Sequence, residues 1–224
     1  MVKEKKKENQ LLNILLNLVI PSVILIKFST DNYLGPIYGM IVALSFPIIY
    51  GIYEFTVRKD INIVSIFGFI SILLTGGISL FELSKNILII KETSIPLLII
   101  VFMMIFKEKT NKFLKNMFAE LFDFDKISKK IGDKKLNNHI TELSKLLKFP
   151  FLVSAALNFT LAFVLIQSAP GTVEYNAQIG KMTALSFPMI ALPSMVVMIG
   201  VLYLFIKRMT KDTGYKFEEL MVQK

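Results

Sequence analysis

The sequence predicts an all-α integral membrane protein, a six-helix bundle with a parallel internal repeat. Three observations predict it. First, 54% of the 224 residues are hydrophobic and the mean hydropathy is +0.59. Second, the charged residues come in blocks, and the apolar stretches between them are about twenty residues long, enough to cross a hydrocarbon core of about 30 Å. Third, one five-residue string occurs twice.

Six apolar spans follow one another along the chain. They cover residues 11–28, 36–55, 61–83, 87–106, 146–167 and 182–209, with a polar loop over 168–181 before the last. The first is interpreted as a retained helix, since no small-residue cleavage pattern follows it. The fourth is the weakest, because it reaches spanning length only if Lys91 and Glu92 lie inside its first turns.

The spans divide the chain into five regions. These are a charged tail (1–10), spans 1–4 (11–106), a basic segment (107–147), spans 5–6 (148–209) and a second tail (210–224). The basic segment places six apolar residues of 111–124 at helical spacing, which predicts an amphipathic helix lying in the headgroup region: Phe113, Leu114, Met117, Phe118, Leu121 and Phe122. A thinner stripe follows at Ile127, Ile131, Leu136, Ile140, Leu143 and Leu147. The lysines of this segment suit either anionic lipid head groups or an ordinary positive-inside loop, and we favour the loop.

Lysine and arginine sort cleanly between the two sides of a six-span topology. Twenty-two of the 26 lie in the N-terminal tail, in the connector after span 2, between Lys107 and Lys148, and from Lys207 onward, while four lie on the other side: Lys27, Lys85, Lys91 and Lys181. Positive residues mark the cytoplasmic side. The sequence therefore predicts a bacterial inner-membrane protein with both termini in the cytoplasm.

The repeated string is ALSFP, at positions 43–47 and 184–188, an offset of 141 residues. The same offset aligns Asn17 with Asn158 and Gly39 with Gly180, and gives eleven identities over 39 positions. Spans 1–2 would thus repeat in spans 5–6, running in the same direction, as occurs in some transporters. Duplication is also a common way to build any bundle.

Paired polar and kink residues form one candidate intramembrane site. A proline leaves the carbonyl four residues earlier without its helical donor, so Ala43 and Ala184 would need other partners, which Ser45 and Ser186 could supply. The site would comprise Asn17, Ser45, Pro47, Asn158, Ser186 and Pro188. The alternative, which we favour, is that the prolines are packing kinks and the asparagines bond across helices.

A charged cluster of Glu82, Lys91 and Glu92 forms the second candidate site. Ionisable groups at membrane depth are functional candidates, here as an ion pair between spans 3 and 4 or as part of a proton relay. The alternative is that these three side chains lie at the membrane interface and are solvated there, and the sequence does not favour either interpretation.

The sequence offers little for catalysis. It contains no cysteine and one histidine, His139, which we expect to be solvated. No nucleotide-binding, hydrolase or metalloprotease motif is present. We therefore expect no enzyme, cofactor or metal, and no nucleic acid partner, because membrane orientation accounts for the positive charge.

Several strings together resemble an uncharacterised family of small bacterial multi-spanning inner-membrane proteins, sometimes labelled major-facilitator-like. They are YLGP, ALSFP, LLTGGISLFEL with IKETSIPLL, AALNFTLAF and GKMTALSFPMIALPSM. GGISL, the Lys91 region and ALNFTLAF more distantly resemble the intracellular septation protein A family, from which this chain differs in lacking tryptophan and in its longer basic segment. That resemblance implies a non-enzymatic role in envelope maintenance or septation.

Two functions are therefore expected. The first is a non-enzymatic envelope protein acting through envelope or division proteins in the bilayer. The second is a small-molecule or ion transporter, acting as a homo-oligomer, for which the repeat, the paired kinks and the charged cluster argue.

Overall fold

The computed structural model of the chain describes residues 14–58 and 73–222. Regular secondary structure in these ranges is helical, apart from one isolated antiparallel bridge between Phe122 and Met221. The chain forms two compact units. Unit 1 comprises Met1–Thr93 and Leu157–Ile190, and unit 2 comprises Ser94–Ala156 and Ala191–Lys224.

Four helices of the described residues are long and apolar enough to cross a membrane. They are Gly35–Tyr53, Lys85–Ile105, Asp133–Leu165 and Val173–Thr213, and a shorter apolar helix spans Leu15–Phe28. Only 17–28% of the most apolar stretch of each long helix is buried inside the protein. Long apolar surfaces left uncovered by protein fit contact with lipid. The prediction of an all-α chain with membrane-length apolar helices is confirmed at this level.

The predicted spans match the observed helices unequally. The weak fourth span is helix α5 (Lys85–Ile105), with Lys91 and Glu92 inside it. The third span is described from residue 73 onward, and its residues 73–80 are helical; the rest lies outside the described residues. The predicted loop 168–181 is wrong from Val173 onward, because α10 (Val173–Ser186) begins there. The Thr172 side chain caps this helix by accepting a bond from the Tyr175 N–H, at 3.2 Å.

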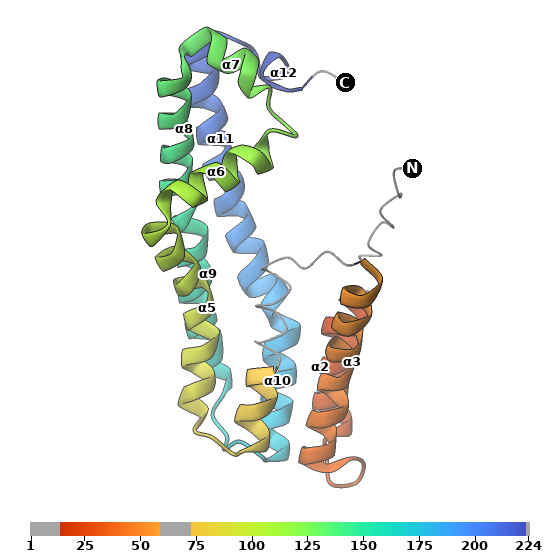
Figure 1. The fold of residues 1–224 in the computed structure, drawn as a ribbon. Coiled ribbons are helices and arrows are strands. Elements are labelled where there is room, and N and C mark those ends of the chain that lie inside the picture. The colour runs from red at the N-terminus through yellow and green to blue at the C-terminus, as the bar shows by residue number, and fades with distance from the viewer. Residues whose placement is uncertain (1–13, 59–72, 223–224) are drawn as a thin grey trace. The chain divides into compact units, whose positions relative to one another are not determined.

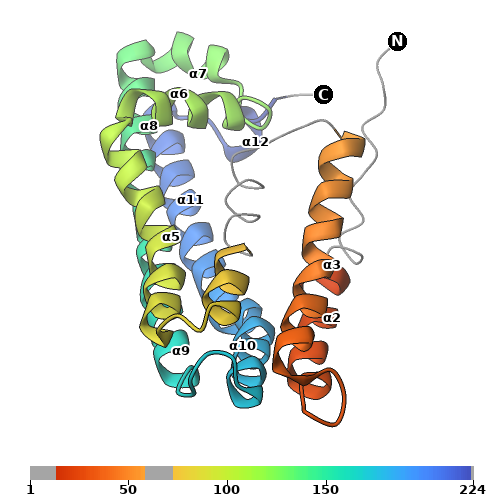
Figure 2. The same cartoon turned by 60° about the horizontal axis from the view of Figure 1, so that its bottom comes forward.

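Unit 1 is organised around the first apolar helix. This helix has two π-helical segments, η1 (Leu15–Val19) and η2 (Ile24–Phe28), with the short α2 (Ile20–Val23) between them. It packs against both α3 (Gly35–Arg58) and α10. Figures 1 and 2 show α2 and α3 side by side.

Two glycines permit this close packing. A Cβ at Gly39 of α3 would come within 2.8 Å of the Ser29 Cα, and a Cβ at Gly180 of α10 would come within 3.0 Å of the Ser22 carbonyl oxygen. Carbon atoms normally approach to about 3.5–4.0 Å, so neither site has room for a side chain. The two glycines are the pair related by the 141-residue offset, and both face the first helix.

Hydrogen bonds join the connections at one end of unit 1. The Asn176 amide donates to the Pro36 carbonyl oxygen at 2.6 Å, which ties the first turn of α10 to that of α3. The Lys85 ammonium donates to the Gln167 carbonyl oxygen at 2.9 Å, and the Gln178 side chain accepts from the Gln167 N–H at 2.9 Å. Helices α3 and α10 therefore begin at the same end of unit 1.

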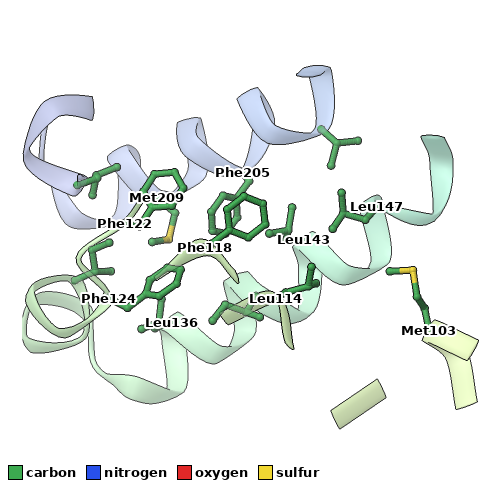
Figure 3. Close-up of a cluster of buried hydrophobic side chains, with 14 residues drawn as sticks. Met103, Leu114, Phe118, Phe122, Phe124, Leu136, Leu143, Leu147, Phe205 and Met209 are labelled. Carbon is green, nitrogen blue, oxygen red and sulfur yellow. The ribbon is translucent and has the colours of Figure 1, made fainter. Parts of the chain in front are cut away.

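Unit 2 has a helical core rich in aromatic side chains. It contains α6 (Lys107–Phe118), α7 (Phe124–Ile131), α8 (Asp133–Leu146), α11 (Leu192–Thr213) and α12 (Phe217–Leu220), together with parts of α5 and of α9 (Lys148–Leu165). Figure 3 shows Phe118, Phe122 and Phe205 close together at its centre, with ring centroids 5.9 Å apart for Phe122 and Phe205. Leu136, Leu143 and Met209 complete this part of the core.

The structure corrects one expectation about the basic segment and places its second apolar stripe. The predicted amphipathic helix over 111–124 ends at Phe118, the last residue of α6. It does not present one apolar face to lipid, because Leu114 and Phe118 are buried in the core while Phe113 and Met117 are exposed. Phe122, beyond the end of the helix, is buried as well. The thinner stripe is likewise core, since Leu136, Ile140, Leu143 and Leu147 are buried. Both stripes thus contribute to one core, together with Val201, Phe205 and Met209 of α11.

His139 is not solvated as expected. Its side chain is only 11% exposed, and its Nε2 lies 2.8 Å from Asp212 Oδ2. Lys135 reaches the same carboxylate oxygen at 3.2 Å. The partner lies 73 residues away in the sequence, which is why the local pattern around His139 did not reveal it.

Candidate functional site: a polar cavity in unit 1

Lys91 and Glu92 form an ion pair inside α5. The Lys91 Nζ lies 2.6 Å from Glu92 Oε1, and the two side chains are 7% and 19% exposed. Neighbouring residues on a helix do not normally face each other, so the long lysine side chain must turn back toward the carboxylate. The same Nζ donates to Thr75 Oγ1 at 2.7 Å. The pair thus holds two opposite charges away from water, where each depends on the other.

Glu92 opens onto a cavity of about 120 Å³. Asn158 of α9 and Thr183 and Ser186 of α10 contribute its other polar lining, and Leu161, Met182 and Ile190 its apolar lining. A cavity needs roughly 10–15 Å³ to hold one water, so this one has room for several waters or a small polar molecule. It combines one carboxylate with an amide and two hydroxyls.

The cavity lies well inside the apolar helices. Glu92 is seven residues from the start of α5 and Asn158 is seven residues from the end of α9. At 1.5 Å per residue, both lie about 10 Å from the corresponding helix end. The ends concerned are adjacent, because Lys85 bonds to Gln167. The polar lining therefore lies about two turns inside these membrane-length helices.

The structure brings together part of each predicted site. Asn158 and Ser186 from the kink set and Glu92 from the charged cluster line the one cavity. Asn17 lies in η1, and Ser45 and Pro47 lie in α3, outside the cavity lining. Apart from Glu92 of α5, the cavity lining thus comes from the second half of the proposed repeat.

The paired serines make the same bond, which differs from the one expected. Ser45 Oγ donates to the Val42 carbonyl oxygen and Ser186 Oγ to the Thr183 carbonyl oxygen, each at 2.7 Å. The acceptor is the carbonyl three residues earlier, so the expectation that Ala43 and Ala184 receive these bonds is wrong. The prolines differ as well. Pro47 lies within an α-helix, whereas Pro188 lies in a π-helical turn, η3 (Phe187–Ala191).

Glu82 takes a separate position from the ion pair. It lies in the turn before α5 with φ 51°, a left-handed conformation that is uncommon for a residue with a side chain. Its carboxylate packs against Gly171, where a Cβ would come within 2.9 Å of Glu82 Oε1. The ion pair predicted between spans 3 and 4 is instead formed within α5, and its contact with the third span is the bond from Lys91 to Thr75.

Two residues of the site were missed by the sequence reasoning. Thr183 lies one turn before Ser186, so helical spacing alone places both on one face. Thr75 gave no local signal, because its role depends on the side chain of Lys91, sixteen residues away. Among the described residues, no group of three or more acidic, histidine or cysteine side chains is arranged to hold a metal.

Comparison with protein-family models, with curated proteins and with solved structures finds no match for this chain. The cavity and its ion pair are thus the observations on which a function can be built.

Proposed function

We propose that the chain is a small transporter or permease that binds a small polar solute or ion in the cavity of unit 1. The observation that carries this proposal is the joining of Glu92, Asn158, Thr183 and Ser186 around one space within apolar helices. Polar groups are costly in hydrocarbon unless they are paired, so a lining of this kind is typical of a solute pathway.

The ion pair fits such a role. With Lys91 bound to Glu92, the cavity carries no net charge from this pair. A solute with a hydrogen-bond donor or a positive charge can share the Glu92 carboxylate with Lys91, while the Asn158 amide can both donate and accept. The substrate class is therefore a small cation, a small zwitterion or a neutral polar molecule.

Flux measurements in liposomes test this proposal. The full-length protein is reconstituted, and uptake of labelled ammonium, sodium, glycine and glycerol is compared with that of protein-free liposomes. We expect faster uptake of at least one of these probes. Glu92→Gln and Asn158→Ala should reduce it tenfold or more, whereas Asn86→Ala, at an exposed position near the start of α5, should leave it unchanged.

Uptake equal to that of protein-free liposomes for every probe would overturn the proposal. The proposal would also be overturned if Glu92→Gln and Asn158→Ala both left the uptake rates unchanged. Each variant must keep the thermal unfolding temperature of the original protein for this comparison.

We further propose that the chain lies in the bacterial inner membrane with six spans and both termini in the cytoplasm. The lysine and arginine distribution supports this topology, as do the hydrogen bonds that join the connections at one end of unit 1. Single cysteines at Asp31 and Lys134 test it in intact cells. An impermeant maleimide should label the first from outside and leave the second unlabelled, and the reverse result would contradict the topology.

A second proposal is a non-enzymatic envelope or septation protein acting through partner proteins, as the resemblance to the septation protein A family implies. The observation that favours it is the folded unit 2, which exposes Phe113, Leu121 and Phe217 beside its lysines. A photo-crosslinking residue at Phe113 tests it in cells. Capture of an envelope or division protein would support it, and capture of lipid alone would count against it.

A further inference from the structure

Unit 2 contains a second cavity, of about 190 Å³, built from its first helices. Met103 and Met104 at the end of α5 form its apolar part. Lys107 of α6, Lys145 of α8 and Lys148 of α9 form its cationic part. The hydroxyl-bearing side chains of Thr141 and Ser144 complete the lining. Three lysines around one small space are unusual, because like charges repel unless an anion lies between them.

The protein itself supplies too little negative charge for these lysines. The Glu142 carboxylate is bound by Lys145 at 2.6 Å and approached by Arg208 at 3.9 Å. The positive charge of Lys107 also attracts this carboxylate. Among the described residues, no carboxylate lies within 4 Å of the Lys107 or Lys148 ammonium. Three cations therefore act on this one acid, and Lys148 adds a further positive charge to the lining, so the cavity is electropositive.

The cavity lies where the chain changes from apolar to charged. Met103 and Met104 are in the last turn of the membrane-length α5, and Lys107 begins α6 directly after it. Lys148 is the first residue of α9, and the apolar part of that helix starts at the next residue. Lysines at the ends of apolar helices lie at the level of the lipid head groups.

We propose that this cavity binds the phosphate of an anionic phospholipid. Lys107 and Lys148 bind its oxygens as point charges, and Ser144 offers a hydroxyl beside them. Met103 and Met104 contact the start of the acyl chains. A free phosphate ion has the same chemistry, but the methionines and the position of the cavity at the end of α5 favour the lipid. This site is separate from the solute cavity of unit 1 and does not depend on the proposed transport.

Native mass spectrometry of the full-length protein tests the proposal. The purified protein is titrated in detergent with phosphatidylglycerol or with phosphatidylcholine of the same acyl chains. We expect one phosphatidylglycerol to bind with clear preference over phosphatidylcholine. The double variant K107Q/K148Q should bind it about thirtyfold more weakly, at roughly 1 kcal/mol per lysine. The matched control K129Q/K134Q removes two exposed lysines that do not line the cavity, and should change binding less than twofold.

Three results would overturn the proposal. Equal binding of the two lipids would show that the head-group charge is not recognised. Equal losses of phosphatidylglycerol binding in the two double variants, both folded by circular dichroism, would show that binding depends only on the net charge of the protein. Displacement of phosphatidylglycerol by millimolar inorganic phosphate would assign the cavity to the free ion, whereas resistance to phosphate supports the lipid.

Discussion

Replacing Gly39 or Gly180 by alanine tests the packing of the first apolar helix in unit 1. In Gly39→Ala the new Cβ would lie 2.7 Å from the Ser29 Cβ and 2.8 Å from the Ser29 Cα. In Gly180→Ala it would lie 2.9 Å from the Leu25 Cβ and 3.0 Å from the Ser22 carbonyl oxygen. Backbone atoms cannot rotate away as a side-chain end can, so the helices must separate. Overpacking of this kind costs about 1–3 kcal/mol.

Gly200→Ala is the matched control, because it lies in α11 with no atom within 4 Å of the new Cβ. All three substitutions gain the same helix propensity, about 1 kcal/mol, so the difference from Gly200→Ala isolates the steric cost. At roughly 2–4 °C per kcal/mol for a chain of this size, the two packing variants should melt about 2–12 °C below the control. Thermal unfolding in detergent measures this. Equal melting temperatures for all three would refute the close packing.

Three further substitutions probe both units by the same assay. Asn176→Ala removes a fully buried amide that donates to the Pro36 carbonyl oxygen, and should cost about 1–3 kcal/mol; no change would show that this bond does not hold α10 to α3. Phe205→Ala removes an aromatic ring from the core of unit 2 and should lower the free energy of unfolding by about 3–5 kcal/mol. Trypsin should then cleave faster at the lysines of α7 and α8. Unchanged cleavage would contradict the packing of that core. Asp212→Asn removes a partly exposed ion pair with Lys135 and alters the hydrogen bond to His139, and should cost no more than about 1 kcal/mol. A larger loss would contradict the assignment of this carboxylate to a partly exposed surface pair.

The membrane-length helices were predictable from the sequence because lipid imposes a simple requirement. A helix in hydrocarbon needs about twenty apolar residues, and that signal is local. Even the weak fourth span was recovered, with Lys91 and Glu92 within it. The start of α10 was missed because residues 173–181 are polar enough to be read as a loop. They form helix because Thr172 caps them and Asn176 bonds to α3.

The arrangement of unit 2 was less predictable, since its core depends on contacts between distant segments. The periodicity of 111–124 indicated one apolar face, whereas Leu114 and Phe118 meet α8 and α11, and Phe113 is left outside. Likewise the pairing of His139 with Asp212 joins α8 to the last turn of α11. No pattern within one helix contains such information.

The sequence indicated which polar residues could form a site, but not which of them lie together in the structure. Asn158, Ser186 and Glu92 stood out because polar groups are costly within apolar spans. Which of them meet depends on how α5, α9 and α10 pack, and that separates them from Asn17, Ser45 and Glu82. The repeat pointed to the pairs Asn17 with Asn158 and Ser45 with Ser186. The cavity lining contains only the second member of each pair, Asn158 and Ser186.

Cysteine labelling of Ser186 tests most directly whether the unit 1 cavity is a polar, water-accessible space. The chain has no native cysteine, so Ser186→Cys and Phe159→Cys each provide a single thiol. Phe159, 47% exposed and next to Asn158 in α9, serves as the lipid-facing control at the same depth. In reconstituted protein, a small charged thiosulfonate reagent should modify the cysteine at 186 at least tenfold faster than the one at 159, because the reaction needs a hydrated thiolate. Equal, slow labelling at both positions would contradict the cavity as a solute site.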